Sequence, residues 1–236
     1  MRVVVPYAAK SPKTRLEPVL TAAERSVFSR AMLADVLRTI VEAGHEPAVV
    51  TTAPLDLADL ELPGEVATST SVVVDDRSLT AAVNARLPTD ERSDAGGSED
   101  GNGDSNAVAV VMADLALASS SALEALFAAA ADVAISPGRA GGTNALVVRH
   151  PAFRVDYHGA SYLDHRVIAS EVGASLETID SFRLATDVDE PVDLVEVLVH
   201  GRETDRAPTC LREFGFELDV RDGRVAVSRE ESAATE

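Results

Sequence analysis

The stretch RVVVPYAAKSPKTRL, residues 2–16, decides how the rest of the chain is interpreted. Its apolar part, Val3 to Val5, has the composition of a fully buried strand, and we expect Pro6 to end that strand. The loop that follows carries Lys10 and Lys13, the only lysines in the sequence, whose other strongly basic side chains are all arginines. Placing both lysines three residues apart, directly after the first strand, favours a role in binding an anion.

The position of this basic loop supports the same interpretation. In open α/β sheets, ligands bind at the carboxyl ends of strands, beside helix N-termini whose free N–H groups favour phosphate. A helix start predicted at Thr21 puts the loop at such a place. Lys10 and Lys13 would supply compact positive charges, and Arg15 could contact two phosphate oxygens at once. The alternative is a solvated basic turn that balances acidic residues, because short basic motifs are weak signals.

Length and composition indicate the class of protein. With 236 residues, of which 46% are hydrophobic, the chain can form one α/β domain over residues 1–236, or two small ones. A net charge of -18 argues against nucleic acid or an anionic membrane as a partner. The single Cys210 allows no intrachain disulfide, and we identify neither a cleavable signal nor a membrane-spanning apolar run. We expect a soluble, cytoplasmic protein.

The acid excess, the replacement of lysine by arginine and the lack of tryptophan together suggest adaptation to a salt-rich cytoplasm. At molar salt the Debye length is about 3 Å, so the self-repulsion of such a surface is largely screened. The sequence therefore predicts loss of structure in low salt.

Strands alternating with helices predict a single, mostly parallel Rossmann-like sheet with helices on both faces. Strands are expected at residues 3–5, 47–52, 70–74, 107–112, 132–136 and 145–149, with a short extended segment at 182–186. The first helix is expected from Thr21 to Gly44, opened by a capping box between Thr21 and Glu24. Further helices are expected at 78–87, 121–131, 161–172 and 191–199. In the third of these five helices, Ser121 and Glu124 repeat the capping-box spacing.

Two segments stand outside this alternation. Residues 90–106 are rich in glycine, serine, asparagine and acids, which predicts a disordered surface insertion. The C-terminal part, 203–236, contains FELDVRDGRVAVS, two alternating runs around Asp222 and Gly223 that predict a β-hairpin with a type I′ turn. Such a hairpin could pair across a homodimer.

Carboxylates are the first candidates for chemistry. Asp114 follows the strongest strand signal, and Asp187 and Asp189 in TDVDE point to the same side if that segment is extended. Convergent carboxylates suit Mg²⁺, which takes one or two of them together with substrate phosphate oxygens and water. The alternative is that these aspartates are solvated surface charges. The chain has 39 acidic residues, and most acidic side chains lie at the surface.

The loop PGRAGGTN, residues 137–144, could bind an anion, because glycines let backbone N–H groups approach closely and because Thr143 and Asn144 add polar groups. A plain turn explains the loop equally well. Ser161, at a predicted helix start, could form another anion site or be an ordinary N-cap. His165 lies one turn further and could face the same pocket, although a surface or capping role is the simpler interpretation.

These motifs together resemble the 2-phospho-L-lactate guanylyltransferase family, which acts in the biosynthesis of the deazaflavin coenzyme F-420. The resemblance lies, in the family's order and over about residues 1–200, in KTRL at 13–16, AMLADVL at 31–37, MADLAL at 112–117, SPGRAGGTNAL at 136–146, Ser161 with His165, and DVDEPVDL at 187–194. It implies a GT-A-like nucleotidyltransferase fold with a nucleotide half and an acceptor half. Two departures are Ala116, where the family usually has proline, and His158, where it usually has glycine.

The resemblance implies metal and acceptor roles for individual residues, and we assign the nucleotide and catalytic roles ourselves. Asp114, Asp187 and Asp189 are expected to hold Mg²⁺. The acceptor site is expected to comprise Thr143, Asn144, Gly159 and Ser161. The nucleotide site is expected to comprise Pro6, Lys10, Lys13 and Asn84, with Asn84 or backbone groups near Pro6 reading guanine. Lys13 and Arg15 are expected to be the catalytic cations.

The expected partners are GTP and a small phosphorylated carboxylic acid. A phosphate oxygen of 2-phospho-L-lactate or phosphoenolpyruvate would attack the α-phosphorus of GTP and release pyrophosphate, with no general base needed. Two alternatives remain open. One is another nucleotidyltransferase of the same fold, acting on a sugar phosphate or a molybdenum cofactor. The other is a non-catalytic nucleotide-binding subunit, against which three intact carboxylates argue.

Overall fold

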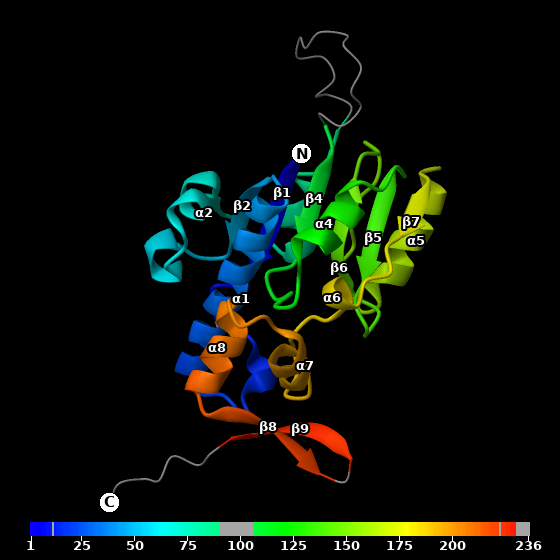
Figure 1. Ribbon diagram of the computed structural model, residues 1–236. Coiled ribbons are helices and arrows are strands. Elements are labelled where there is room, and N and C mark those ends of the chain that lie inside the picture. The colour runs from blue at the N-terminus through cyan, green and yellow to red at the C-terminus, as the bar shows by residue number, and fades with distance from the viewer. Residues whose placement is uncertain (11, 90–105, 222, 230–236) are drawn as a thin grey trace, which may run out of the picture.

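A seven-stranded sheet forms the centre of the computed structural model, which describes residues 1–10, 12–89, 106–221 and 223–229 (Figure 1). The strand order is β3-β2-β1-β4-β6-β5-β7, and every neighbouring pair is parallel except those that involve β6. The strands are β1 (Arg2–Tyr7), β2 (Glu46–Thr51), β3 (Ser71–Val74), β4 (Val108–Val111), β5 (Val133–Pro137), β6 (Thr143–Val148) and β7 (Leu176–Thr178). The predicted mostly parallel sheet is confirmed.

Helices follow most strands, as predicted. They are α1 (Ala22–Glu42), α2 (Gly64–Ser69), α3 (Leu79–Asn84), α4 (Ser120–Phe127), α5 (Ser161–Glu171), α6 (Phe182–Ala185), α7 (Asp193–His200) and α8 (Arg206–Glu213), with the short 3-10 helices η1 (Thr14–Leu16) and η2 (Leu57–Leu60). None of the helices in the described ranges is both long and apolar enough to cross a membrane.

The sheet has a buried apolar cluster on each face. Val3 and Val5 of β1 pack on one face, together with residues of α1 and α4. Val4 points to the opposite face, where it packs with residues of α3 and α5. This alternation follows from the two-residue period of a strand, and a sheet covered on both sides explains why its strands are nearly uninterrupted apolar runs.

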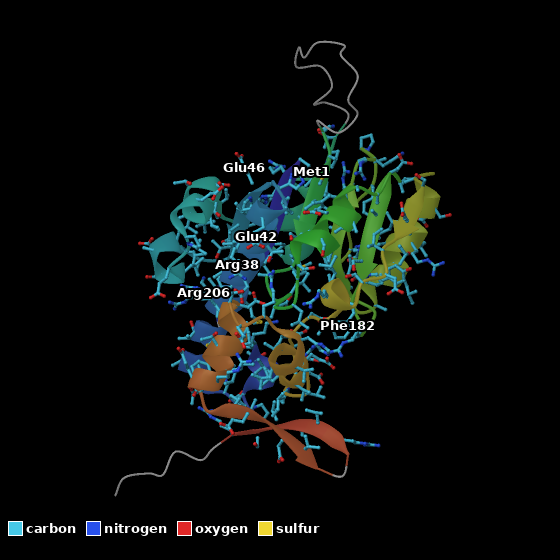
Figure 2. All side chains as sticks on the ribbon, in the orientation of Figure 1. Met1, Arg38, Glu42, Glu46, Phe182 and Arg206 are labelled. Carbon is cyan, nitrogen blue, oxygen red and sulfur yellow. The ribbon has the colours of Figure 1, made fainter. Side chains whose placement is uncertain are left out.

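A third buried cluster lies beyond the carboxyl edge of the sheet. There the first half of α1 packs against α7, α8 and the hairpin formed by β8 (Phe216–Arg221) and β9 (Arg224–Arg229), which Figure 1 shows below the sheet. Helix α1 reaches both regions because its 21 residues span about 30 Å. Figure 2 shows Arg38 and Arg206 at the junction of α1 and α8, where Arg38 Nη2 lies 2.6 Å from Oδ1 of Asp205.

The predicted capping box opens α1. The Thr21 side chain accepts a hydrogen bond from the N–H of Glu24 at 3.3 Å, and the Thr21 N–H donates to Oε2 of Glu24 at 2.8 Å. After the helix, Gly44 has φ 79°, a left-handed conformation that glycine adopts without steric cost. Helix α4, in contrast, is capped by Ser119 and not by Ser121.

Several boundaries differ from the prediction. Pro6 does not end β1, because the strand continues to Tyr7; β4 pairs only with Arg2 to Val4, so the missing N–H of Pro6 leaves that ladder intact. The segment predicted as extended forms α6, capped by Ser181, whose side chain accepts from the N–H of Leu184. Helix α7 begins at Asp193, two residues after Pro191.

The C-terminal hairpin is confirmed, with β8 and β9 antiparallel. Asp222 of its predicted turn lies outside the described residues, as does the predicted insertion except for Asn106. Strand β7 and helix α8 were not predicted. The homodimer stays a prediction.

Candidate functional site

The chain changes direction at β1. From β1 it winds outward through β2 to β3, and it then returns to the other side of β1 as β4. Such a switch point leaves a crevice outside the carboxyl ends of the two central strands. A cavity of about 470 Å³ opens there, lined by the loop after β1 and by the ends of β2, β3 and β4. This volume suits a small-molecule ligand.

Lys13 lies at the wall of this cavity, between two carboxylates. Its Nζ is 2.6 Å from Oδ2 of Asp114 and 2.8 Å from Oδ1 of Asp189, and its side chain is 10% exposed. Burial acts to lower the pKa of Lys13, but the two carboxylates outweigh it, so the pKa is raised and the lysine carries a charge. Arg15 is 68% exposed, with Nη1 3.4 Å from Oδ2 of Asp189.

The backbone of Lys13 is strained. Its φ of 54° and ψ of 47° are in the left-handed region, which non-glycine residues seldom adopt. Such a conformation costs on the order of 1 kcal/mol and persists where the surroundings enforce it, which happens most often at functional sites.

Asn144 holds the third predicted carboxylate. Because β6 is antiparallel to β4, its first residues lie at the edge where β1 and β4 end. The Asn144 Nδ2 donates to Oδ1 of Asp187 at 3.0 Å and to the carbonyl oxygen of Leu184 at 2.9 Å. Burial raises the pKa of Asp187 against the Asn144 hydrogen bond, and the negative charges of Asp114 and Asp189 raise it further.

This edge fits a hard divalent cation. Among the residues that the structure describes, Oδ1 of Asp114 is buried without a hydrogen-bond partner, and such a carboxylate oxygen is costly unless a cation or a donor reaches it. The described residues contain no group of three or more His, Cys, Asp or Glu side chains able to hold a metal alone. A Mg²⁺ ion would therefore depend on substrate oxygens, as is usual for this ion.

The predicted acceptor residues gather where β6 and α5 begin. The N–H of Tyr162, in the first turn of α5, donates to the carbonyl oxygen of Gly141 at 3.1 Å and so ties the glycine-rich loop to the helix. Thr143 and Ser161 are both buried, and Gly159 has φ 47°. The side chain of Thr143 contacts His165, which is fully buried, so the surface position that the sequence favoured for His165 is wrong.

Two predicted nucleotide residues lie elsewhere. Lys10 is exposed and does not line the cavity. Asn84 is also outside the cavity lining, and its amide binds the backbone of Val155, with Nδ2 2.9 Å from the carbonyl oxygen and Oδ1 2.8 Å from the N–H. Pro6 does line the cavity, as predicted.

Asp193 supports the site and was missed. Its Oδ2 accepts the N–H groups of Asp189 and Glu190 at 3.0 and 2.8 Å, and its Oδ1 accepts from Nη2 of Arg139 at 2.7 Å. Asp193 thus fixes the loop that carries Asp189. The sequence carried a signal for this contact, because an aspartate at the start of a helix commonly accepts hydrogen bonds from backbone N–H groups three or four positions before it.

Asp75 and Arg77, which the sequence analysis also missed, line the cavity after the end of β3. Asp75, which follows β3, accepts from Nε and Nη2 of Arg77 at 2.9 and 2.7 Å, and from Nη1 of Arg86 at 2.6 Å. These arginines lower the pKa of Asp75. Arg77 lines the cavity and adds a third cation to its wall, beside Lys13 and Arg15.

Comparison with known proteins gives consistent results. A family model described as guanylyl transferase CofC like matches residues 1–230. A 2-phospho-L-lactate guanylyltransferase of Haloterrigena turkmenica is 70% identical over 233 residues, which cover 99% of this chain and 99% of that protein. The protein of the same name from Haloferax volcanii is 51% identical over 230 residues, which cover 98% and 99% of the two chains.

Two solved structures share the fold. A Desulfovibrio desulfuricans G20 protein described as a nucleotide-diphospho-sugar transferase superposes with a TM-score of 0.69 at 14% identity, covering 90% of this chain and 94% of that one. A nucleotidyl transferase from Methanothermobacter gives a TM-score of 0.51 at 16% identity, covering 84% and 96%. At these identities the likeness shows the fold alone.

Proposed function

Because the chain belongs to the family of CofC-like guanylyl transferases, we propose that it transfers a guanylyl group from GTP to the phosphate of 2-phospho-L-lactate, or of phosphoenolpyruvate. The observation that carries the proposal is the position of Lys13, charged, strained and held between Asp114 and Asp189 at the wall of the cavity. The cavity is lined by three cations and by the three aspartates that pair with them, a combination that suits a nucleoside triphosphate bound with a divalent metal ion.

The two substrates would approach the same edge of the sheet from different elements. GTP would occupy the cavity at the ends of β1 to β4, with Lys13 and Arg15 facing its phosphates. The phosphorylated acid would bind where β6 and α5 begin, at Thr143 and Ser161. Thr143 and Asn144 are consecutive, and Asn144 binds Asp187, so the acceptor residues adjoin the acidic edge.

The reaction needs positioning and charge neutralisation more than proton transfer. An oxygen of the acceptor phosphate forms a bond to the α-phosphorus of GTP, while the bond from that phosphorus to the bridging oxygen breaks and pyrophosphate leaves with the electron pair. The nucleophile is already anionic, so no general base is required. Lys13 and Arg15 would stabilise the negative charge that shifts toward the leaving group.

Asp114, Asp187 and Asp189 would hold Mg²⁺ together with oxygens of the bound substrates. When bound, the ion neutralises charge on phosphate oxygens and orients them. Lys13 then has two roles: it balances Asp114 and Asp189 while the site is without its substrates, and it faces the phosphates when GTP is present. Asn144 and Asp193 would keep the carboxylates in place in both states.

The direct test is pyrophosphate release in concentrated KCl from GTP and Mg²⁺, with 2-phospho-L-lactate, phosphoenolpyruvate and 3-phosphoglycerate supplied separately. Release with one of the first two, and little with ATP in place of GTP, is the expected result. Reactions without acceptor measure background hydrolysis. Folded protein that releases pyrophosphate with none of the three acids would refute the proposed acceptor class.

A further inference from the structure

A buried histidine that the proposed reaction does not use directly contacts Thr143. Nδ1 of His165 lies 2.9 Å from Oγ1 of Thr143, and Nε2 of His165 accepts a hydrogen bond from the backbone N–H of Asp156 at 2.9 Å. The imidazole is fully buried, and the rings of Phe153 and Tyr157 pack edge-on against it with centroids 5.9 and 5.4 Å away. Its orientation is therefore fixed from several sides.

The backbone contact determines which nitrogen carries the hydrogen. An N–H group can only donate, so Nε2 of His165, facing the Asp156 N–H, must be the unprotonated nitrogen. Burial lowers the pKa of His165 to about 4, so the ring is neutral near pH 7. A neutral imidazole with a bare Nε2 carries its hydrogen on Nδ1. Nδ1 therefore donates to Oγ1 of Thr143.

This donation decides what Thr143 can offer to a ligand. With a lone pair of Oγ1 engaged by His165, the hydroxyl hydrogen is left to point elsewhere. Within the described ranges, His165 is the one hydrogen-bond partner of Oγ1. If His165 had the opposite tautomer, the Thr143 hydroxyl would donate its hydrogen to Nδ1. The hydroxyl would then present only lone pairs to an anion, and these lone pairs would repel the anion.

We propose that His165 is a positioning residue that makes Thr143 a hydrogen-bond donor to the anionic acceptor substrate. The inference rests on the proposed function, in which Thr143 belongs to the acceptor site. His165 itself does not touch the substrate. A hydrogen bond to a charged group is stronger than a neutral one. Loss of the hydrogen bond from the Thr143 hydroxyl to the acceptor should therefore weaken acceptor binding by about 10- to 100-fold without changing GTP binding.

Two amide variants separate the two contacts of the ring. In His165→Asn the amide nitrogen can replace Nδ1 and donate to Thr143, while the contact with Asp156 is lost. In His165→Gln the longer side chain can replace Nε2 and accept from Asp156, while the donor to Thr143 is lost. Both variants remove the same ring from the same pocket, so each is the control for the packing effect of the other.

Kinetics should distinguish the variants. We expect His165→Gln to raise the KM for the acceptor about tenfold with an unchanged KM for GTP, and His165→Asn to stay within about threefold of wild type. In a Thr143→Val background, His165→Gln should have no further effect on acceptor KM, because the two residues act through one contact. Equal losses in both His165 variants, or an undiminished effect without the Thr143 hydroxyl, would overturn the proposal.

A measurement on the wild-type protein does not depend on whether the variants fold. Nitrogen chemical shifts of the ¹⁵N-labelled imidazoles report the tautomer, and His165→Asn identifies its signal among the five histidines; failing that, the buried ring is assigned from contacts to Phe153. A neutral ring protonated on Nδ1 is expected; protonation on Nε2 would contradict the inference. If wild type uses none of the acids, the proposed function fails, whereas this tautomer result stands independently.

Discussion

Nζ of Lys13 lies 2.6 Å from Oδ2 of Asp114, although 101 positions separate the two residues in the chain. The contact joins the loop after β1 to the loop after β4, on the two sides of the switch point of the sheet. A cation held between carboxylates at the place where a phosphate ligand should bind can change partners when a ligand with its own metal arrives.

Lys13→Ala should lower kcat by about 100-fold or more, because in the proposed reaction it removes a preorganised positive charge that faces the phosphates of GTP. Lys10→Ala is the matched comparison, since Lys10 is the other lysine of the same loop but is exposed and outside the cavity lining. We expect its effect to stay within a few-fold. Turnover numbers from pyrophosphate release in concentrated KCl, with circular dichroism to verify folding, are the measurement. Near-normal turnover of Lys13→Ala would remove Lys13 from the mechanism.

Gly138→Ala should impair the acidic edge indirectly. A Cβ at this position would lie 2.6 Å from Oδ1 of Asn144, which is held by hydrogen bonds and cannot easily move away. Displacing Asn144 frees Asp187, so we expect activity to fall about tenfold and to require more Mg²⁺, as in Asn144→Ala. Gly64→Ala is the control, because its added Cβ would meet no atom of the described part of the chain within 4 Å. Mg²⁺ titrations of activity that coincide for Gly138→Ala and wild type would contradict this.

The sequence predicts those parts of the fold that carry their own local signal. Buried strands such as β4 are unbroken apolar runs, and a capping box marks the start of α1. Helix α8 has no such signal: it contains Pro208, and its first N–H groups are capped by Asp35, some 170 positions earlier in the chain. A cap supplied from another helix cannot be inferred from neighbouring residues.

The candidate site shows the same division. Asp114 could be predicted because a polar residue directly after a buried strand lies at the ligand edge of the sheet. The hydrogen bonds of Asn84 and His165 could not be predicted, because each depends on a backbone group that the fold brings near. The Asn84 amide binds the backbone of Val155, and the His165 imidazole binds the backbone of Asp156. The residue type indicates hydrogen-bonding capacity, and only the tertiary structure decides how that capacity is used.

Asp35 should make stability depend on pH. It is buried and accepts the N–H groups of Arg206 and Ala207 at 2.9 and 2.8 Å. Burial raises its pKa to about 6, opposed by these hydrogen bonds and by Arg38, with Asp205 raising it further. Because the folded state binds the proton more tightly, this contribution to stability is present at low pH and is lost as pH rises through about 6.

His165 acts in the opposite direction, since its lowered pKa favours the folded state at higher pH, so a variant is needed to isolate Asp35. The measurement is the free energy of unfolding by denaturant, in concentrated KCl, for wild type and Asp35→Asn between pH 5 and 7.5. We expect the wild-type value minus the variant value to fall by about 1 kcal/mol over this range. A difference that does not change with pH would show that Asp35 has an ordinary pKa.

Cys210 offers a probe of the predicted salt dependence. The thiol is buried in α8, and burial, assisted by the carboxylates of Glu213 and Glu24, raises its pKa to about 12. Because the thiolate is the reactive form, a disulfide reagent should label the folded protein very slowly. Labelling at neutral pH should therefore report the opening of the cluster formed by α1, α7 and α8.

In molar KCl the repulsion within a chain of net charge -18 is largely screened, whereas at about 0.1 M the Debye length grows to about 10 Å and many more surface charges repel each other. We expect Cys210 to be labelled at least about tenfold faster at 0.1 M than at 3 M KCl, together with loss of the circular dichroism signal, since a tenfold change corresponds to about 1.4 kcal/mol of opening free energy. A Cys210→Ser variant shows that the signal comes from this thiol. Faster labelling with an unchanged dichroism spectrum would assign the opening to α8 alone, and slow labelling with a native spectrum at 0.1 M would mean that the acidic surface does not need salt to stay folded.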